Sequence, residues 1–524
     1  MERIRKVLSI GLCLIMCFVL MAACNGDGNK ESSEGSSSQQ DAGVKYAESI
    51  DIIGDNAIIA SINLYLQAAH NSPGNWVFNM IYDKLLLNRG PGNYQPMLAT
   101  KWETSDWKTF TFTLREDVNF HNGDHFTAQD VIDTIEAARE AVGVNTYDKW
   151  AAVDTATAVD TYTLQLVLHE VNVDFLEDIS DPASSITNKR AMTEDPENGM
   201  QIGTGAYKVV DFSIGDYVVF ERNDDYWGEP PITKRITLRY VPETSARLMM
   251  LQNGQSDVCF SLDPVDREVI EADTANFVSY PFVMNNLNGL GFSYRHPVCA
   301  DYNFRMAVAS AIDREQITLA ACGIYGIPET TGNIYGYETE FRRDDIPIIP
   351  YDLDKAREYL ANSIYDGTPI EIVASLETNI MAAEVVQEQL RAIGLETDIK
   401  VVDVPSMSAY LRSDDAQMRC FLIPQNSLSA SIFRNAFYPG TATNTAGYEN
   451  PRATELFDRA SSTTDRGERE KLYHEIQEII AADVPYINMF WLGHTAACVK
   501  GVGGLYLSSA MFQFDFRYIY KIID

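Results

Sequence analysis

Short runs of alternating apolar and polar residues recur through the first half of the chain. Residues 110–114 (FTFTL) and 162–168 (YTLQLVL) alternate with a period of two, which is typical of strands that bury one face. Residues 203–210, 217–222 and 234–241 are also short apolar runs, and Gly, Asp and Pro separate them. This spacing predicts antiparallel strands joined by turns.

Helical periodicity occurs in two stretches that also contain capping residues. Apolar residues in 128–138 recur at helical spacing and form one face. Thr127 and Asp130 have the spacing of a capping box, in which each side chain bonds the backbone of the other. Residues 304–322 predict a second helical stretch that breaks at Asp313, because an aspartate there can cap a new helix.

The second half of the chain predicts a parallel sheet covered by helices. A strand at 369–373, a helix at 381–393 ended by Gly394, and a strand at 396–402 make one βαβ unit. Later segments predict helices at 453–460 and 466–481 and an aromatic strand at 486–492. We therefore predict a mixed α/β protein, and because no long linker divides it, its domains could be built from discontinuous segments.

The first residues have the pattern of an export signal. Three basic residues precede a run of apolar and small residues at 7–23, which is short for a membrane span. Ala22 and Ala23 stand directly before Cys24 and resemble a bacterial lipobox, after which the cysteine sulfur receives a diacylglycerol. We therefore expect residues 1–23 to be a lipoprotein signal peptide and Cys24 to be the lipidation site. An uncleaved anchor helix is the alternative.

The segment after Cys24 predicts a flexible tether. Residues 24–45 are rich in Gly, Ser and charged residues and contain almost no large apolar side chain. Such a segment cannot bury a core, and its length gives a root-mean-square reach of about 25 Å. The prediction is a folded body outside the cytoplasm, held at the outer face of a membrane by a lipid on Cys24.

Charge and cysteine content narrow the possible partners. The chain of 524 residues contains 74 Asp and Glu against 41 Lys and Arg, a net charge of −33, which argues against nucleic acid binding. The cysteines after Cys24 number five, so at most two disulfides could form; they are Cys259, Cys299, Cys322, Cys420 and Cys498. No cysteine or histidine spacing is typical of a zinc site, and we expect no metal and no cofactor.

The sequence contains no common catalytic motif. A phosphate-binding loop, a nucleophile elbow and a zinc-protease helix are all missing from it. His121 and His125 are four residues apart, but the Asn-Gly-Asp between them predicts a turn, so they share no helical face. We expect a binding protein that is not an enzyme. A surface hydrolase with a Cys/His pair or paired carboxylates is the alternative from a different class.

Three groups of short motifs follow one another from residue 82 to residue 451. The first comprises YDKL (82–85), PMLATKWE (96–103) and VNFHNGDHFTAQDV (118–131); the second GTGAY (203–207) and RNDDYW (222–227); the third FRMAV (304–308), AIDR (311–314) and GYENP (447–451). Together they resemble the family 5 extracellular solute-binding proteins of ATP-binding-cassette (ABC) importers, the oligopeptide, dipeptide and nickel-binding group.

We expect most of these motif residues to have structural roles. We expect glycines to supply turns or positive-φ positions, namely Gly123, Gly203 and Gly205. We expect the large aromatic residues to fill cores and not to touch a ligand, namely Trp102, Phe112, Tyr207 and Trp227.

The resemblance implies an α/β fold of two lobes, like the class II periplasmic binding proteins, with an extra domain inserted in the first lobe. The implied divisions are lobe I at 46–80, 199–284 and 497–524, the inserted domain at 81–198, and lobe II at 285–496. It also implies a monomer whose lobes close on a small solute and present it to the permease subunits of an importer.

One departure from the family pattern affects the expected ligand. Peptide binders of the family often have a W-x-x-D segment whose aspartate meets the ligand's α-amino group. The matching region here, 421–429 (FLIPQNSLS), has neither a tryptophan nor an acid. This segment therefore offers no acid for a charge-assisted hydrogen bond to the α-ammonium of a peptide. Sugars and capped peptides become stronger candidates for the ligand. Arg434 could pair a ligand carboxylate or form a surface or interdomain ion pair.

The candidate ligand-binding residues are aromatic and polar side chains. They are Trp76, Asn288, Phe292, Asn426, Phe433, Arg434, Tyr438, Asn444, Phe490 and Trp491. Each aromatic residue among them could equally fill a core. His494 could serve a metal-chelate ligand.

We therefore predict a lipid-anchored substrate-binding protein that delivers a small solute to an ABC importer, with an oligopeptide as the first candidate. The alternatives are a sensor lipoprotein that presents a signal peptide and a sugar- or metal-chelate-binding member of the same family.

Overall fold

The computed structural model describes residues 44–54, 61–66, 69–70, 72–283, 285–403, 406–407, 410–423, 425, 427–441, 444–507 and 514–523. The predicted signal peptide, Cys24 and residues 25–43 of the predicted tether lie outside these ranges. Residues 45–524 form one compact unit, and we keep the names lobe I, inserted domain and lobe II for its predicted segments.

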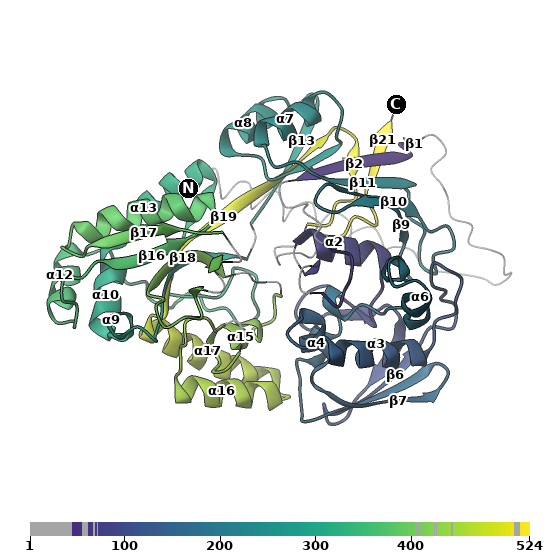
Figure 1. Cartoon of the computed structure of the whole chain (residues 1–524), viewed down its shortest axis with the longest axis horizontal. Coiled ribbons are helices and arrows are strands. Elements are labelled where there is room, and N and C mark those ends of the chain that lie inside the picture. The colour runs from purple at the N-terminus through teal and green to yellow at the C-terminus, as the bar shows by residue number, and fades with distance from the viewer. Residues whose placement is uncertain are drawn as a thin grey trace, which may run out of the picture. The chain divides into compact units, whose positions relative to one another are not determined.

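One long strand, β19 at Tyr486–Val499, belongs to both halves of the main sheet. Its first half pairs antiparallel with β14 (Leu287–Phe292) and β15 (Gly326–Pro328). Its second half pairs antiparallel with β13 (Phe277–Val283) and β12 (Val258–Phe260). In Figure 1, β19 runs from the lobe II elements to those of lobe I. The predicted strand at 486–492 is therefore only the lobe II half of a strand that links the lobes.

Lobe I continues the sheet beyond β12. β2 (Ser49–Gly54) lies parallel to β12 and to β11 (Arg235–Tyr240), and β10 (Tyr217–Arg222) and β9 (Tyr207–Ser213) follow antiparallel. The three predicted antiparallel strands are confirmed. Among the described residues, the helical segments of this lobe are α2 (Ser72–Ile81), η4 (Gly199–Gln201), α7 (Thr244–Gln252) and α8 (Pro264–Ala272). A small sheet joins β1 (Lys45–Tyr46), β21 (Tyr520–Ile523) and β20 (Val502–Gly503).

The inserted domain has a sheet and a hydrophobic core of its own. Its strands pair antiparallel in the order β5 (Ala99–Glu103), β6 (Thr109–Leu114), β8 (Thr163–Leu168) and β7 (Val153–Asp160). A second pair joins β3 (Leu86–Asn88) to β4 (Tyr94–Pro96). The helical segments are α3 (Ala128–Glu140), α4 (Asn145–Trp150), α5 (Phe175–Asp178), η3 (Pro182–Ser184) and α6 (Lys189–Glu194).

The predicted helix start in the inserted domain is confirmed. Thr127 is the N-cap of α3, and its backbone N–H donates to Asp130 Oδ2 at 2.8 Å, which closes the predicted capping box. The apolar side of the helix packs into the core, where Val131 and Ile135 are buried among sheet residues such as Phe112.

Lobe II contains the predicted parallel unit. β16 (Ile370–Ala374) and β17 (Thr397–Val401) pair parallel, with α13 (Glu377–Arg391) between them in sequence. β18 (Met418–Ile423) lies parallel to β16 and antiparallel to β14. Gly394 follows α13 with a φ of 86°, as its predicted role in ending the helix requires. The predicted βαβ unit is thus confirmed.

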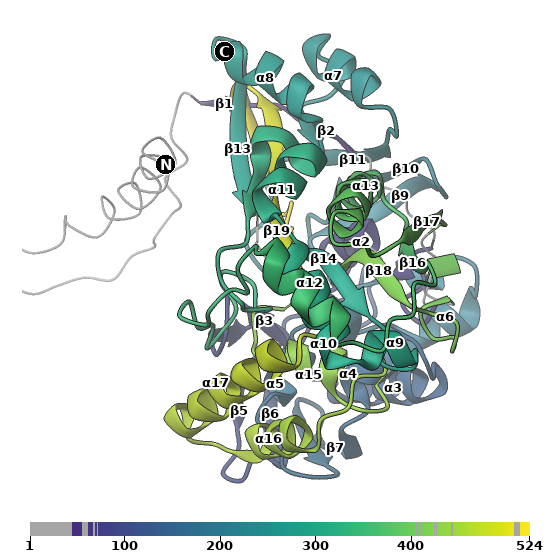
Figure 2. The ribbon, with the colours of Figure 1, turned by 90° about the vertical axis from the view of Figure 1, so that its left-hand side faces the viewer.

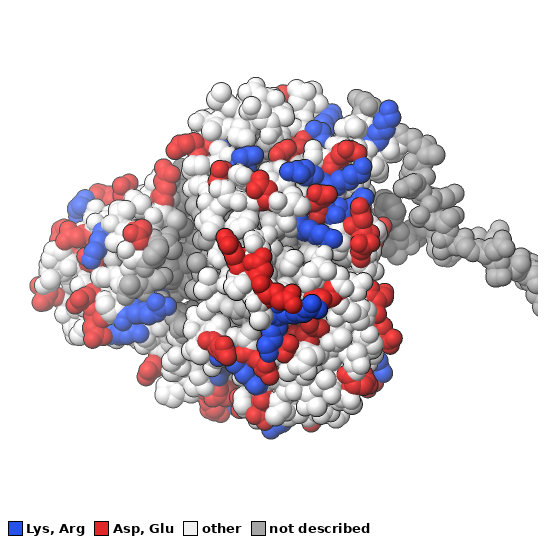
Figure 3. Space-filling view, turned by 45° about the vertical axis from the view of Figure 1, so that its right-hand side comes forward, with Lys and Arg blue, Asp and Glu red and all other residues white. Residues whose placement is uncertain are grey.

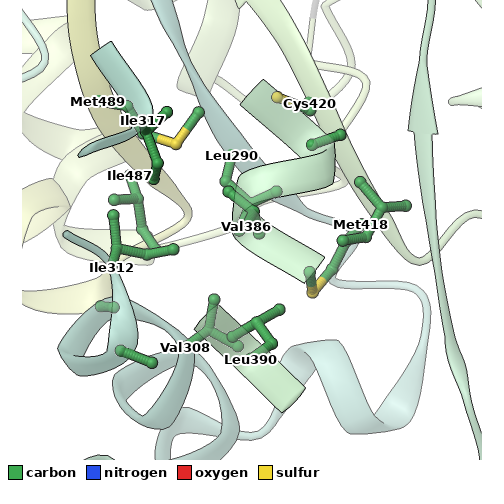
Figure 4. Close-up of a cluster of buried hydrophobic side chains, with 14 of the residues drawn as sticks. Leu290, Val308, Ile312, Ile317, Val386, Leu390, Met418, Cys420, Ile487 and Met489 are labelled. Atoms are coloured by element: carbon green, nitrogen blue, oxygen red, sulfur yellow. The ribbon is translucent and has the colours of Figure 1, made fainter. Parts of the chain in front are cut away.

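Helices on the lobe II sheet enclose a core drawn in Figure 4, in which Val308, Val386 and Leu390 face Leu290 and Ile487 of the sheet. The helices of this lobe whose bounds lie within the described residues are α9 (Pro297–Ala300), α10 (Tyr302–Ala311), α11 (Arg314–Cys322), η5 (Gly323–Tyr325), α12 (Leu353–Ala361), α15 (Ile432–Phe437), α16 (Pro451–Ser462) and α17 (Arg466–Asp483). Asp313 caps α11 through Gln316 N–H, so the predicted helix break is confirmed. Figure 2 shows α16 and α17 side by side.

The cysteines of the folded part serve as small apolar core residues. Cys299, Cys322, Cys420 and Cys498 are buried free thiols, and Cys259 is also buried, so no disulfide links these five residues. Burial raises the pKa of Cys299, Cys322 and Cys420 to about 12, which keeps these thiols protonated.

Two further properties concern membrane crossing and surface charge. Within the described ranges, no helix combines the length and apolarity needed to cross a bilayer. On the face shown in Figure 3, acidic side chains are numerous and basic ones lie interspersed among them, as expected for a chain with a net charge of −33.

Candidate ligand-binding site

Motifs from separate stretches of the sequence meet at the buried carboxylate of Asp83. It accepts hydrogen bonds from Thr204 Oγ1 (3.1 Å), Trp227 Nε1 (2.8 Å) and Tyr226 Oη (3.3 Å). Arg517 Nη1 lies 3.8 Å away. Burial raises the pKa of Asp83, and the cationic and hydrogen-bonding partners act against that rise. These motif residues therefore hold the inserted domain against lobe I.

Two glycines of the same joint are needed for close approach. A Cβ on Gly203 would lie 1.9 Å from Ile81 O, and a Cβ on Gly205 would lie 2.5 Å from Met80 O. Neither glycine has a positive φ, whereas Gly123 does, at 87°. A left-handed backbone is therefore found for Gly123 alone, and a packing requirement explains the other two.

His121, one of the two histidines in the predicted turn, belongs to this joint. Its Nε2 lies 2.9 Å from Gly205 O, and its own backbone N–H donates to Gly203 O. Burial lowers the pKa of His121 to about 4, so its ring is neutral. The structure thus gives His121 a packing role. His125 bonds Asn119 and Tyr162 at the surface.

The inserted domain also contacts lobe II, through its short helix α5. Ser427 Oγ donates to Glu177 Oε1, and Arg469 Nη2 lies 2.5 Å from Asp174 Oδ1. The other oxygen of Glu177 accepts hydrogen bonds from Asn88 Nδ2 (2.9 Å) and Tyr94 Oη (3.0 Å). All of these groups are buried or half-buried, so the contact is largely shielded from water. We call this set of residues the interlobe contact.

Several carboxylates lie close together beside the interlobe contact, and burial changes their pKa values. Burial raises the pKa of Asp174 to about 6, although Arg469 opposes the rise. Burial also raises the pKa of Asp178 to about 7. Lys149 Nζ lies 3.4 Å from both Asp178 Oδ1 and Asp181 Oδ2, and these carboxylates raise the pKa of the lysine. One lysine thus partly neutralises the acids beside the interlobe contact.

On the lobe II side, a buried carboxylate fixes side chains of β19. Glu329 Oε2 accepts from Asn488 Nδ2 and Trp491 Nε1, both at 2.9 Å. Its other oxygen accepts the backbone N–H groups of Thr330 and Thr331 at 2.8 Å. Trp491, a predicted ligand residue, is completely buried with its indole held by this bond.

Most of the predicted aromatic site residues lie inside cores. Phe292 and Phe490 have no exposed surface and belong to the main lobe II core. Phe433 packs against Tyr335 in the second lobe II core. Trp76 lies in the lobe I core and stacks on Phe514. Aromatic side chains bury large apolar areas, which explains why these residues pack in the cores.

The remaining predicted residues lie in hydrogen-bonded or ion-paired positions. Arg434 pairs with Asp458 at 3.3 Å and stacks on Tyr438, whose hydroxyl donates to the same Asp458. Asn444 bonds the backbone of Tyr438 and Tyr448 and so holds a loop. The ion pair, which the sequence left open for Arg434, is thus present within lobe II.

One predicted position, Asn288, lies where β14 meets its neighbouring strands. Asn288 is buried on β14, opposite Phe490 of β19 and Leu422 of β18. Asn426 lies outside the described residues. His494 is stacked on Phe282, and burial lowers its pKa to about 4. No group of three or more potential metal ligands occurs among the described residues.

Sequence reasoning missed the residues of the interlobe contact. Asp174 and Glu177 stand in a short stretch of mixed apolar and polar residues without any motif, and Arg469 is one of several charged residues on α17. Nothing in their spacing distinguishes them from solvated surface residues. Only the folded chain shows that they meet across more than 200 residues of sequence.

Known proteins resemble this chain over most of its length. The family model "Bacterial extracellular solute-binding proteins, family 5 Middle" matches residues 93–445. The glutathione-binding protein GsiB of Pectobacterium atrosepticum is 26% identical, with 80% of this chain and 84% of that protein covered. The dipeptide-binding protein DppE of Bacillus subtilis is 24% identical, with 94% of each covered.

A solved structure agrees with the fold. The periplasmic binding protein DppA of Helicobacter pylori, in complex with the peptide STSA, superimposes with a TM-score of 0.78 at 20% identity and covers 91% of this chain and 98% of that one. The predicted α/β class and the predicted resemblance are both confirmed. The chain belongs to the bacterial extracellular solute-binding proteins of family 5, the substrate-binding components of ABC importers.

Proposed function

We propose that this protein captures a peptide outside the cytoplasm and closes its lobes over it for delivery to the importer. The observation on which the closing rests is β19, because a single strand belongs to the sheets of both lobes and can bend between them. In such a protein a ligand that touches both lobes stabilises the closed form, and the importer recognises that form.

A peptide as ligand is supported by the named relatives and by one feature of the interlobe contact. GsiB, DppE and DppA are named for glutathione, dipeptide or peptide ligands. The segment 421–429 contains no acid of its own, but Ser427 in it bonds Glu177 of the inserted domain. A carboxylate therefore does lie beside the segment in which peptide binders have their aspartate.

We further propose that a lipid on Cys24 holds the protein at the membrane. The supporting features are Ala22-Ala23-Cys24 after the apolar run and the Gly/Ser-rich segment that follows. Two acyl chains give stable attachment where one would be marginal. The tether leaves the folded body free to reach the permease.

The ligand class can be tested by thermal unfolding in the presence of a panel of tripeptides, disaccharides and nickel–histidine. A ligand present at 100 times its Kd stabilises the folded state by about 2.7 kcal/mol, which is a readily measured rise in Tm. We expect tripeptides to raise the Tm and the other compounds to leave it unchanged. A rise with a disaccharide or nickel–histidine and none with any peptide contradicts the peptide assignment.

The interlobe contact is expected to influence affinity. Arg469 of lobe II pairs with the half-buried Asp174 of the inserted domain, and this ion pair exists only when the two parts are together. Arg469→Gln removes the pair, so the closed form becomes less stable. Hydrogen bonds to charged groups contribute about 1.5–3 kcal/mol, which corresponds to a rise in peptide Kd of about tenfold or more. Isothermal titration with the peptide that gives the largest Tm rise measures this.

The matched control is Arg452→Gln. Arg452 pairs with Glu475 on the exposed surface of the same lobe. Its replacement is expected to change the peptide Kd less than twofold. An equal effect of both variants would show that the interlobe contact plays no part in closing.

A further inference from the structure

A cationic pocket lies where lobe I meets the inserted domain. It is a small hollow that is partly open to solvent. Its lining residues are Asn79, Lys84, Leu87, Asn88, Arg89, Ser180, Pro182, Tyr506, Asp515 and Arg517. Three of them are cations and one is an acid, which is unusual in a chain with a net charge of −33.

The acid of the pocket is already paired. Asp515 Oδ1 and Oδ2 accept from Arg517 Nε and Nη2, the latter at 2.6 Å, and both side chains are buried. Asp83 lies 3.8 Å from the same guanidinium on its other side. Arg517 is thus neutralised, which leaves Lys84 and Arg89 as the cations with charge to offer.

Lys84 is buried without a carboxylate partner. It is 6% exposed, and its ammonium donates to the neutral Asn79 Oδ1 at 3.0 Å. Among the described residues, no carboxylate lies within 4 Å of the Lys84 ammonium or of the Arg89 guanidinium, which stacks on Tyr506. Burial, with a smaller contribution from Arg517, lowers the pKa of Lys84 to about 8, and Asp181, Asp515 and Asp83 act against the change.

The contrast with Lys149 shows that the missing partner is a local feature. Both lysines belong to the inserted domain, where Lys84 is buried and Lys149 is half-buried. Lys149 lies 3.4 Å from two carboxylates, which raise its pKa against the effect of burial. An unpaired buried ammonium is costly to a fold, so a lysine with a purely structural role would be expected to have a partner like those of Lys149.

The pocket lies directly beside the interlobe contact. Asn88 lines the pocket and donates to Glu177 Oε2, and the other oxygen of Glu177 accepts from Ser427 of lobe II. A ligand held between the inserted domain and lobe II can therefore extend one end toward Lys84.

We propose that this pocket binds a carboxylate of the imported solute, with Lys84 and Arg89 as its cationic partners. The proposal rests on the proposed function, in that the solute is a peptide, and it narrows the ligand class to peptides with a free carboxylate at one end. The bound carboxylate supplies the counter-charge that Lys84 lacks.

The test compares peptide ligands with and without the carboxylate. Titration calorimetry measures Kd for Ala-Ala-Ala, for its C-terminal amide and for Ala-Ala-Asp-amide, in the full folded protein. We expect the amide to bind about tenfold or more weakly than the acid, and Lys84→Met to abolish that difference. Binding of Ala-Ala-Asp-amide as tight as that of the acid would identify a side-chain carboxylate as the group recognised.

The variants are controlled for folding. Lys84→Met removes an unpaired buried charge, so its Tm without ligand is expected to equal or exceed that of the wild type, whereas loss of a structural residue would lower it. Lys101→Met removes an exposed lysine of the same domain, which pairs with Glu103 at the surface, and is expected to leave every Kd unchanged.

The outcomes separate this inference from the proposed function. Equal binding of acid and amide by the wild type, or a preference for the acid that persists in Lys84→Met, overturns the pocket assignment and leaves peptide binding intact. If no peptide binds, the proposed function fails, and the pocket is then tested by thermal unfolding with succinate. A rise in Tm with succinate that disappears in Lys84→Met retains the pocket as a carboxylate site, and no such rise overturns it.

Discussion

Replacing Asp83 with leucine is expected to lower the free energy of unfolding by about 3–5 kcal/mol. The substitution leaves Trp227 Nε1, Thr204 Oγ1 and Tyr226 Oη without their acceptor in a site closed to water. It also removes a carboxylate from beside Arg517, which stays charged and buried. Urea unfolding followed by circular dichroism measures the change.

The exposed acid Asp117 provides the control for this prediction. Its nearest cation, Arg115, lies 3.7 Å away, and the carboxylate is 65% exposed. Asp117→Leu is expected to change the free energy of unfolding by less than about 0.5 kcal/mol, because surface ion pairs contribute little. A loss below 1 kcal/mol for Asp83→Leu would mean that the meeting of the motifs at this carboxylate does not stabilise the joint.

Replacing Cys24 with serine is expected to abolish lipid attachment completely, because a hydroxyl does not form the thioether. Growth with an alkyne-bearing palmitic acid, followed by coupling to a fluorophore, should label the wild-type protein and leave Cys24→Ser unlabelled. Detergent phase partition should show the matching change, with the wild type in the detergent phase. The expected difference is all-or-none.

Cys17→Ser is the matched control for lipidation, since Cys17 lies within the apolar run and not after the two alanines. It should be labelled like the wild type. If neither the wild type nor Cys17→Ser takes up the label, while intact residues 1–23 are found by mass spectrometry on the membrane-bound protein, the uncleaved anchor helix is the correct reading.

Local patterns in the sequence predicted many of the secondary elements because their determinants are local. The Thr127 and Asp130 pair caps a helix with bonds that span three residues, and Asp313 ends one helix and starts another in the same way. Gly394 ends α13 through its own positive φ. None of these features depends on a distant part of the chain.

The full length of β19, in contrast, could not be predicted from local sequence. Its aromatic first half was predicted, but its second half, from Gly493 to Val499, is a strand because β12 and β13 of lobe I pair with it. Those partners lie more than 200 residues away, so the local sequence contains no record of them. The link between the lobes therefore became visible only in the sheet topology.

The candidate site shows the same limit more strongly. Phe292, Phe490 and Trp491 were candidates because aromatic side chains suit both ligands and cores, and the tertiary packing put them in cores. Glu177 and Lys84 had no motif to suggest a site. Their environment, one bonded to lobe II and the other buried without an acid, arises from segments brought together by folding.

The sequence by itself determined the family, the export pattern, the α/β class and the caps of the helices, because ordered motifs and short-range hydrogen bonds are written in adjacent residues. The tertiary structure alone decided which charges lose their water and which find partners. Desolvation and pairing depend on groups from distant segments. Lys149 therefore lies beside two carboxylates, whereas Lys84 in the same domain has no carboxylate among the described residues within 4 Å.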